Sequence, residues 1–311
     1  MQTGQRRFLD IGKLLVMIAL VFAAIGCGKQ EKPQPTEKLT AFVTIAPQEY
    51  VVERIGGDLV EAETLVPAGQ SPHTYEPTPQ QIAQLEQADV YFRIGLAIEN
   101  RIMDRVAGMI GTEHVVDTRL GVPLREIEGH HHEGEEATEE HSEGGGAADP
   151  HIWLDPVLMK TQAQTVANAL MQLHPERRDQ LAANLAAFQH DLDSVDAQIH
   201  LILDPLQGRA MYVFHPAYGY FADRYGLRQV AIESGGKEPS ARELTELIDR
   251  ARADSVTSVF VQRQFARKTA QAVADAIGAN VVVLDHLSDD YLNNLLHMAR
   301  LIASGLTQGE E

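Results

Sequence analysis

Short apolar runs alternate with amphipathic segments along most of the chain. In the first half, apolar runs at 39–45, 60–66 and 89–95 predict strands, and the segments 49–57 and 77–88 predict helices. This alternation is typical of βα units, in which the strands form a parallel sheet that is covered by helices. The pattern therefore predicts an α/β fold for this half of the chain.

The second half has the same kind of pattern, although no repeat is visible in the sequence itself. Apolar runs at 209–215, 228–233, 256–262 and 279–285 predict buried strands, and the segment 239–253 predicts a helix. With 311 residues, the chain is long enough for two domains. We therefore expect a second α/β unit after the first.

Two of the predicted helices begin with a capping box. Thr78 and Gln81 have the spacing of such a box at the start of the first-half helix, and Pro79 occupies the first helical position. Ser240 and Glu243 have the same spacing in the second half. These signals define the first residues of the two helices more precisely than periodicity alone does.

A single long helix is predicted between the halves, over residues 175–203. Its apolar positions are separated by alternating steps of four and three residues, which gives one apolar seam, and at ~1.5 Å per residue it would be roughly 43 Å long. A coiled-coil dimer is the alternative, but we interpret the segment as a rigid linker helix within a monomer. The seam residues are Leu181, Leu185, Phe188, Leu192, Val195, Ile199 and Ile202.

The N-terminus has the pattern of an export signal. Basic residues precede thirteen uncharged residues, LLVMIALVFAAIG, a stretch too short to span a bilayer. Small residues then lead to Cys27, the only cysteine, which resembles a bacterial lipoprotein cleavage box. We predict a signal peptide over 1–26, lipidation of Cys27 and a tether over 27–38, so that the protein is extracytoplasmic and membrane-anchored, in the periplasm or at the cell surface. A simple signal peptide or an N-terminal membrane anchor are the alternatives.

The remaining chain divides at the linker helix into an N-terminal unit, 39–174, and a C-terminal unit, 204–311. Within the first, residues 126–148 are rich in Glu, His and Gly, and they predict a mobile loop because they cannot bury enough apolar surface. Eight glutamates without Lys or Arg fall in 126–143, and the net charge of the chain is −18. Such a surface repels phosphate backbones, so nucleic acid is not an expected partner.

Four residues at predicted strand ends or loops have side chains that suit a metal ion. His73 precedes a helix start, His151 lies before Asp155, a predicted helix cap, and His215 and Asp285 each end a predicted strand. Ligands of open α/β sheets collect at the carboxyl ends of strands, and three imidazoles with one carboxylate form a tetrahedral set suited to zinc. Taken singly, each histidine has a simpler interpretation as a turn or core residue, and Asp285 as a helix cap.

Several segments resemble the signature motifs of metal-specific solute-binding lipoproteins of bacterial ABC transporters for zinc or manganese. The resemblance runs from residue 39 to the C-terminus and includes the acidic, histidine-rich insertion. It implies two α/β lobes joined by one long helix, a metal in the cleft between the lobes, and a membrane permease as partner. The motifs are SPHTYEPTPQQIAQLEQADV, GLAIENRI, DPHIWLDP, FHPAYGYFADRYGL and VVLDHLSDDYL.

The resemblance also implies which lobe provides each ligand. His73 and His151 would come from the N-terminal lobe, and His215 and Asp285 from the C-terminal lobe. The family often has DPL where this chain has DHL, so His286 competes with Asp285 for the fourth position. Some zinc-binding members have an acid beside the first histidine, and Pro72 at that place favours Asp285.

The histidine-rich loop predicts a second, weaker kind of metal binding. Imidazoles and carboxylates on a mobile segment bind divalent ions without selecting a geometry, so we expect the tight site at His151. A solvated loop without any role is the simpler alternative. The accessory residues would be His130, His131, His132 and His141.

Several functions remain open at this point. Imidazole-rich sites favour zinc, whereas manganese prefers more oxygen ligands. Manganese is therefore the alternative to zinc. A zinc hydrolase would use the three histidines with Asp285 or Glu76 as base, but the chain has no HExxH, GxSxG or P-loop motif. A closed four-ligand site favours a binding protein that is not an enzyme. Some relatives have an adhesion role, on which these residues give no information.

Overall fold

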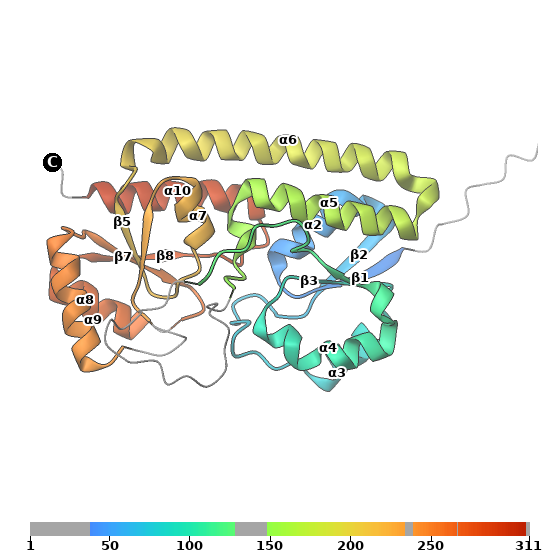
Figure 1. The fold of residues 1–311 in the computed structure, drawn as a ribbon, viewed down its shortest axis with the longest axis horizontal. Coiled ribbons are helices and arrows are strands. Elements are labelled where there is room, and N and C mark those ends of the chain that lie inside the picture. The colour runs from blue at the N-terminus through green and yellow to red at the C-terminus, as the bar shows by residue number, and fades with distance from the viewer. Residues whose placement is uncertain (1–37, 128–147, 234–238, 266, 309–311) are drawn as a thin grey trace, which may run out of the picture. The chain divides into compact units, whose positions relative to one another are not determined.

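The structure is a computed structural model that describes residues 38–127, 148–233, 239–265 and 267–308 (Figure 1). The predicted signal peptide, Cys27, almost all of the tether and the four accessory histidines lie outside these ranges. In the part of the chain that is described, no helix has both the length and the apolarity needed to cross a bilayer.

The N-terminal lobe contains a four-stranded parallel sheet in the order β2-β1-β3-β4. The strand order reverses between β1 and β3, so the loops that follow these two strands lead to opposite sides of the sheet. Such a switch point leaves a crevice at the carboxyl ends of the strands. The strands are β1 Leu39–Val43, β2 Val60–Thr64, β3 Val90–Arg93 and β4 Val115–Asp117. The helices are α2 Ala46–Gly56, α3 Pro79–Leu85, α4 Ala97–Ile110 and α5 Pro156–Leu173.

The C-terminal lobe repeats this winding, with a parallel sheet in the order β6-β5-β7-β8. Its switch point lies between β5 and β7. The strands are β5 Ala210–Val213, β6 Arg228–Ala231, β7 Ser258–Gln262 and β8 Asn280–Leu284. The helices are α7 Gly219–Arg224, α8 Ala241–Ala253, α9 Arg267–Ile277 and α10 Tyr291–Thr307. Two α/β lobes with parallel sheets, as the sequence predicts, are thereby confirmed.

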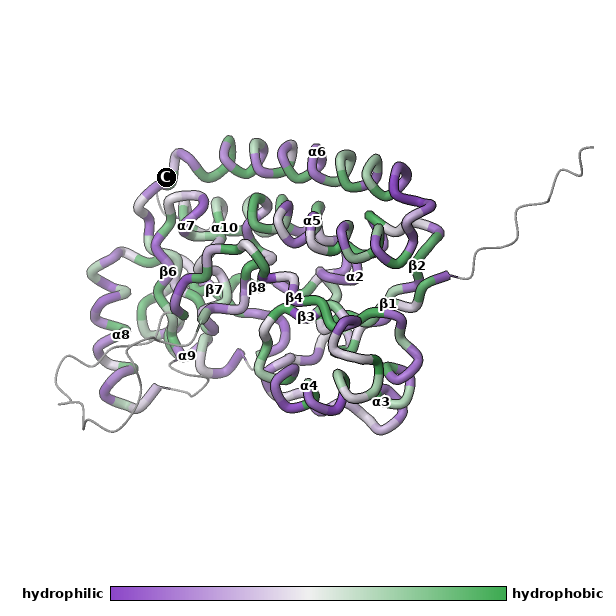
Figure 2. Tube along the Cα trace, turned by 45° about the vertical axis from the view of Figure 1, so that its right-hand side comes forward, coloured by the Kyte–Doolittle hydropathy of each residue, from purple (hydrophilic) through white to green (hydrophobic). Residues whose placement is uncertain are grey.

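The long helix α6, Arg178–Leu203, runs along both lobes (Figure 1). It packs on α5 and α2 of the first lobe and on α10 of the second. The predicted seam is buried except for Ile202, which is half-buried because Leu203 takes the last core position instead. Polar and apolar residues alternate along the α6 coil in Figure 2, as expected for a helix with one buried stripe. Residues 175–177, predicted as helix, form a separate 3-10 turn.

One continuous apolar core serves both lobes. It contains residues of β1 and β3, the α6 seam, and residues of β5, β7 and α10. A second cluster covers the other face of the C-terminal sheet, beneath α8 and α9. Because the lobes share a core, they are held together by buried apolar surface as well as by the covalent link through α6.

The predicted helix starts are present. The Thr78 hydroxyl accepts a hydrogen bond from the Gln81 N–H (3.2 Å), and the Ser240 hydroxyl accepts one from the Glu243 N–H (3.3 Å). The Asp155 carboxylate accepts from the Val157 N–H at 2.7 Å and so caps α5. These caps fix the loops that immediately precede α3 and α5, and those loops carry His73 and His151.

Candidate metal site

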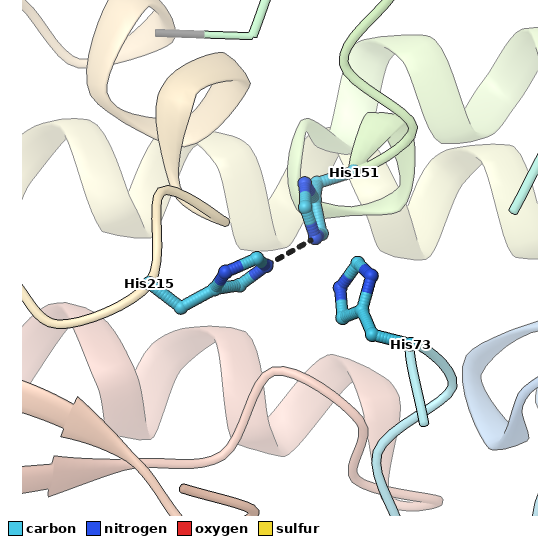
Figure 3. A group of neighbouring side chains, drawn as sticks. All are labelled: His73, His151 and His215. Atoms are coloured by element: carbon cyan, nitrogen blue, oxygen red, sulfur yellow. Dashed lines mark hydrogen bonds between the residues drawn. The ribbon is translucent and has the colours of Figure 1, made fainter. Parts of the chain in front are cut away.

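Three imidazoles from distant parts of the sequence meet between the lobes (Figure 3). His73 comes from the loop before α3, His151 from the turn before α5, and His215 from the loop after β5. One ring nitrogen of each lies within 4.8 Å of those of the other two. The ring centroids of His73 and His215 are 4.7 Å apart, and those of His151 and His215 are 5.2 Å apart. Among the described residues, this is the one group of three or more metal-ligating side chains so close together.

His215 is fixed by the neighbouring strand of its sheet. It follows β5 at the switch point, where the Gln262 side chain at the end of β7 accepts from the His215 N–H (3.2 Å) and donates to the His215 carbonyl (2.6 Å). The buried Glu233 carboxylate contacts Nδ1 of the ring, and Phe265 stacks on its face with centroids 4.9 Å apart. The imidazole is therefore held with Nε2 toward the other two histidines.

His151 is held in the same way by a different acid. Oδ1 of the fully buried Asp149 lies 2.7 Å from Nδ1 of His151 and accepts the His151 backbone N–H at 3.0 Å. A carboxylate at Nδ1 requires the proton to be on that nitrogen, so the lone pair is on Nε2. His151 is 1% exposed, and its ring also contacts Trp153.

His73 completes the group from a loop on the first lobe. Its Nε2 is buried and has no hydrogen-bond partner among the described residues. Burial and, to a smaller extent, the neighbouring His215 and His151 rings together lower the pKa of His73 to about 3. Burial also lowers the pKa of His151, against the opposing effect of Asp149. At neutral pH these two rings are uncharged and can donate a lone pair to a cation.

The distance between Nε2 of His151 and Nε2 of His215 is 3.3 Å. If both rings carry their proton on Nδ1, no proton lies between these nitrogens, and two lone pairs face each other. Two imidazole nitrogens bound to a tetrahedral zinc at about 2.0–2.1 Å would be separated by about 3.3 Å. The arrangement therefore suits a cation between the rings, and the spacing suits zinc.

The Asp285 carboxylate is not part of the three-histidine group. Its Oδ1 accepts from the Leu287 N–H at 3.1 Å and lies 3.4 Å from the Gln264 amide, and its Oδ2 lies 3.5 Å from the Arg263 guanidinium. The side chain lines a cavity of about 380 Å³ that residues of both lobes border, among them Gly69 and His297. In the structure the Asp285 carboxylate is thus turned toward Leu287, Gln264 and Arg263.

His286 borders the three-histidine group. Its ring is 2% exposed, stacks on Trp153 and has its centroid 6.1 Å from that of His151. Its Nδ1 has no hydrogen-bond partner in the described part of the chain. Burial lowers the pKa of His286 well below the usual value, and the His151, His215 and His73 rings lower it further. At neutral pH the His286 ring is therefore uncharged and can offer a lone pair at the edge of the group.

Sequence reasoning did not identify the residues that orient the ligands. Asp149 stands two positions before His151, and this short spacing is a signal that could have been used. Glu233 follows β6 and Gln262 ends β7, and only the strand order brings them to His215. No local pattern in the sequence indicates that contact.

Comparison with known proteins identifies the family. Residues 42–305 match the model of ZnuA, the periplasmic component A of the zinc-uptake complex. The chain belongs to this family. It is 28% identical over 289 residues to the high-affinity zinc uptake system protein ZnuA of Yersinia pestis, covering 86% of this chain and 91% of that protein. It is also 28% identical to the protein of the same name from Bacillus subtilis, covering 88% of each.

Solved structures support the same assignment. A crystal structure of ZnuA matches with a TM-score of 0.78 and 41% identity, over 86% of this chain and 99% of that one. The resemblance to metal-specific solute-binding proteins is thereby confirmed. Membership of an uptake family favours a binding protein over the zinc hydrolase that three histidines alone would allow.

Proposed function

We propose that this protein captures zinc outside the cytoplasm and delivers it to an ABC-type permease for uptake. The observation that carries the proposal is the pair of Nε2 atoms 3.3 Å apart, each on a ring whose Nδ1 contacts a buried carboxylate. The names of the relatives from Yersinia pestis and Bacillus subtilis, both zinc uptake proteins, support the same cargo. Manganese is the second candidate, but a site with at least three imidazoles favours zinc.

We further propose that the mature protein begins at a lipidated Cys27 and acts as a monomer. The family description as periplasmic supports a location outside the cytoplasm. A lipid on the first residue would keep the binding lobes near the permease, with residues 28–38 as the tether. Mass spectrometry of the N-terminal peptide of the protein from membranes checks the anchor, and an unmodified Cys27 would contradict it.

The function is tested by metal titration of the chain from residue 28 onward, with and without residues 128–147. We expect one tightly bound zinc per chain in both forms, which manganese in large excess does not displace. A weaker class of sites, formed by His130, His131, His132 and His141, should be present only in the complete chain. Keeping residues 126 and 148 preserves the backbone bridge between them. Loss of the tight site with the segment, or equal affinity for manganese, would contradict the proposal.

The fourth ligand comes, in this proposal, from Asp285. Its contacts with Gln264 and Arg263 are long, at 3.4 and 3.5 Å, so turning the carboxylate toward a cation costs mainly the hydrogen bond that Oδ1 accepts from the Leu287 N–H at 3.1 Å. A carboxylate would also cancel one of the two charges of the zinc ion, which the neutral His286 ring cannot do.

A pair of matched variants distinguishes the two candidates. Loss of a residue that hydrogen-bonds to a metal ligand typically weakens metal binding about 10- to 100-fold. We expect Asp285→Asn, which removes a ligand itself, to weaken zinc binding at least as much. His286→Gln should change the affinity by less than about threefold. Competitive titration with a zinc chelator measures both, and the reverse order of effects would assign the fourth position to His286.

A further inference from the structure

Arg125 connects the two lobes beside the metal site. It lies in the N-terminal lobe, where the Asp149 N–H donates to the Arg125 carbonyl at 2.8 Å. Its Nη1 is 3.2 Å from Oδ2 of Asp149, and its Nε is 3.0 Å from Oδ2 of Asp223 on α7 of the C-terminal lobe. One guanidinium therefore pairs with a carboxylate from each lobe. Planar guanidinium groups suit this double contact better than an ammonium group does.

Tyr220 of α7 closes the same contact from the other side. Its hydroxyl accepts from the Arg125 N–H at 3.0 Å and donates to the Asp149 carbonyl at 3.1 Å. Its ring lies below the guanidinium, 5.8 Å from ring centroid to Cζ. Gly219, the first residue of α7, leaves the space that the guanidinium fills: a Cβ at this position would lie 1.4 Å from Nη1 of Arg125. The contact therefore depends on the close approach of α7.

Asp149 links this contact to the metal site. One of its oxygens, Oδ1, binds the ring and the backbone N–H of His151, and the other, Oδ2, binds Arg125. The carboxylate is fully buried, and a buried charge is costly unless it is paired and hydrogen-bonded, so Asp149 depends on these partners. A continuous series of contacts thus runs from α7 through Arg125 and Asp149 to the imidazole of His151.

We propose that Arg125 is a positioning residue that orients His151 through Asp149 only while α7 is docked against it. The inference rests on the proposed function, since it concerns retention of the same zinc ion. When the lobes are together, Asp149 is clamped and His151 is presented firmly to the metal. When α7 moves away, Arg125 loses Asp223 and Tyr220, Asp149 is clamped less firmly, and the metal is released faster. Docking of α7 and retention of zinc are thereby coupled.

The test is the rate at which a chelator removes zinc from the loaded protein, measured by stopped flow. We expect Arg125→Gln to release zinc about 10- to 100-fold faster than the wild type, the range typical for residues that orient a metal ligand. Gly219→Ala should also accelerate release, because a methyl group on α7 displaces the guanidinium and presses on Oδ2 of Asp149, at 2.9 Å, without removing either charge. Arg125→Lys should give an intermediate rate, since an ammonium group cannot hold both carboxylates at once.

The matched control is Arg224→Gln on α7, the helix that carries Gly219 and Tyr220. Arg224 pairs with Asp196 of α6, with Nε 3.0 Å from Oδ1, and does not contact Asp149 in the described structure. We expect it to lower the melting temperature of the zinc-free protein but to leave the release rate within about twofold of the wild type. If Arg125 had a purely structural role, Arg125→Gln and Gly219→Ala would behave like this control, with a lower melting temperature and an unchanged release rate. That outcome would overturn the inference. Failure of the wild type to retain zinc would instead contradict the proposed function.

Discussion

Replacing His151 by alanine is expected to weaken zinc binding by two to three orders of magnitude. Structural zinc sites with four ligands bind with roughly 10–16 kcal/mol, so each ligand accounts for about 2.5–4 kcal/mol. His151 is buried, and Asp149 fixes its Nε2 3.3 Å from that of His215. Alanine removes a nitrogen ligand whose orientation Asp149 already fixes. A water molecule that took its place would not be held in this orientation.

The measurement is a competitive titration of the zinc-binding domain against a chelator of known affinity. His200→Ala is the matched control, because His200 lies on α6, pairs with Asp204 and is not a member of the three-histidine group. We expect the control to bind zinc as the wild type does. Affinity of His151→Ala within about threefold of the wild type would show that the tight site lies elsewhere.

The second large effect is expected from Phe188→Ala on the long helix α6. Phe188 is fully buried, its ring centroid lies 6.0 Å from that of Tyr50, and the Arg54 guanidinium lies over it at 5.7 Å. Truncation of a buried phenylalanine leaves a cavity and typically lowers the free energy of unfolding by about 3–5 kcal/mol. Since the lobes share the core around α6, we expect one destabilised transition that includes both.

Urea unfolding of the zinc-free protein, followed by circular dichroism, measures this change. Leu201→Ala is the control on the same helix, because Leu201 is 80% exposed and its removal should change the free energy of unfolding by less than about 0.5 kcal/mol. If Phe188→Ala lowered the free energy of unfolding by no more than the control, α6 would not be the shared support of the two lobes.

The fold could be predicted from the sequence to the extent that it depends on local periodicity. The apolar runs that became strands are short and rich in β-branched residues, and the α6 seam repeats over seven positions, so both patterns are read without tertiary information. Helices α4, α7, α9 and α10 and strand β4 are not among the predicted elements, and of α5 only the cap Asp155 is. Predicted strand ends extend up to two residues too far, because the apolar run continues past the end of the strand, as at Phe214 after β5.

The candidate site could be predicted only in part, for a physical reason. Each histidine is marked by its own loop, with a neighbouring proline or helix cap, and these signals are local. The partners that aim the rings are not: Glu233 reaches His215 because β6 is paired beside β5, and Gln262 because β7 is paired on its other side. The direction of the Asp285 carboxylate depends likewise on Gln264 and Arg263, whose contacts follow from packing rather than from spacing along the chain.

The apolar core common to both lobes has a consequence for how cargo can leave. A wide swing of one lobe would bring the hydrocarbon surface of α6 and α10 into contact with water, at about 25 cal/mol for every Å² exposed. Movements of short segments such as the loop that carries His73 expose far less of that surface. We therefore expect release of the cargo to involve local shifts of α7 and of single loops rather than a wide separation of the lobes.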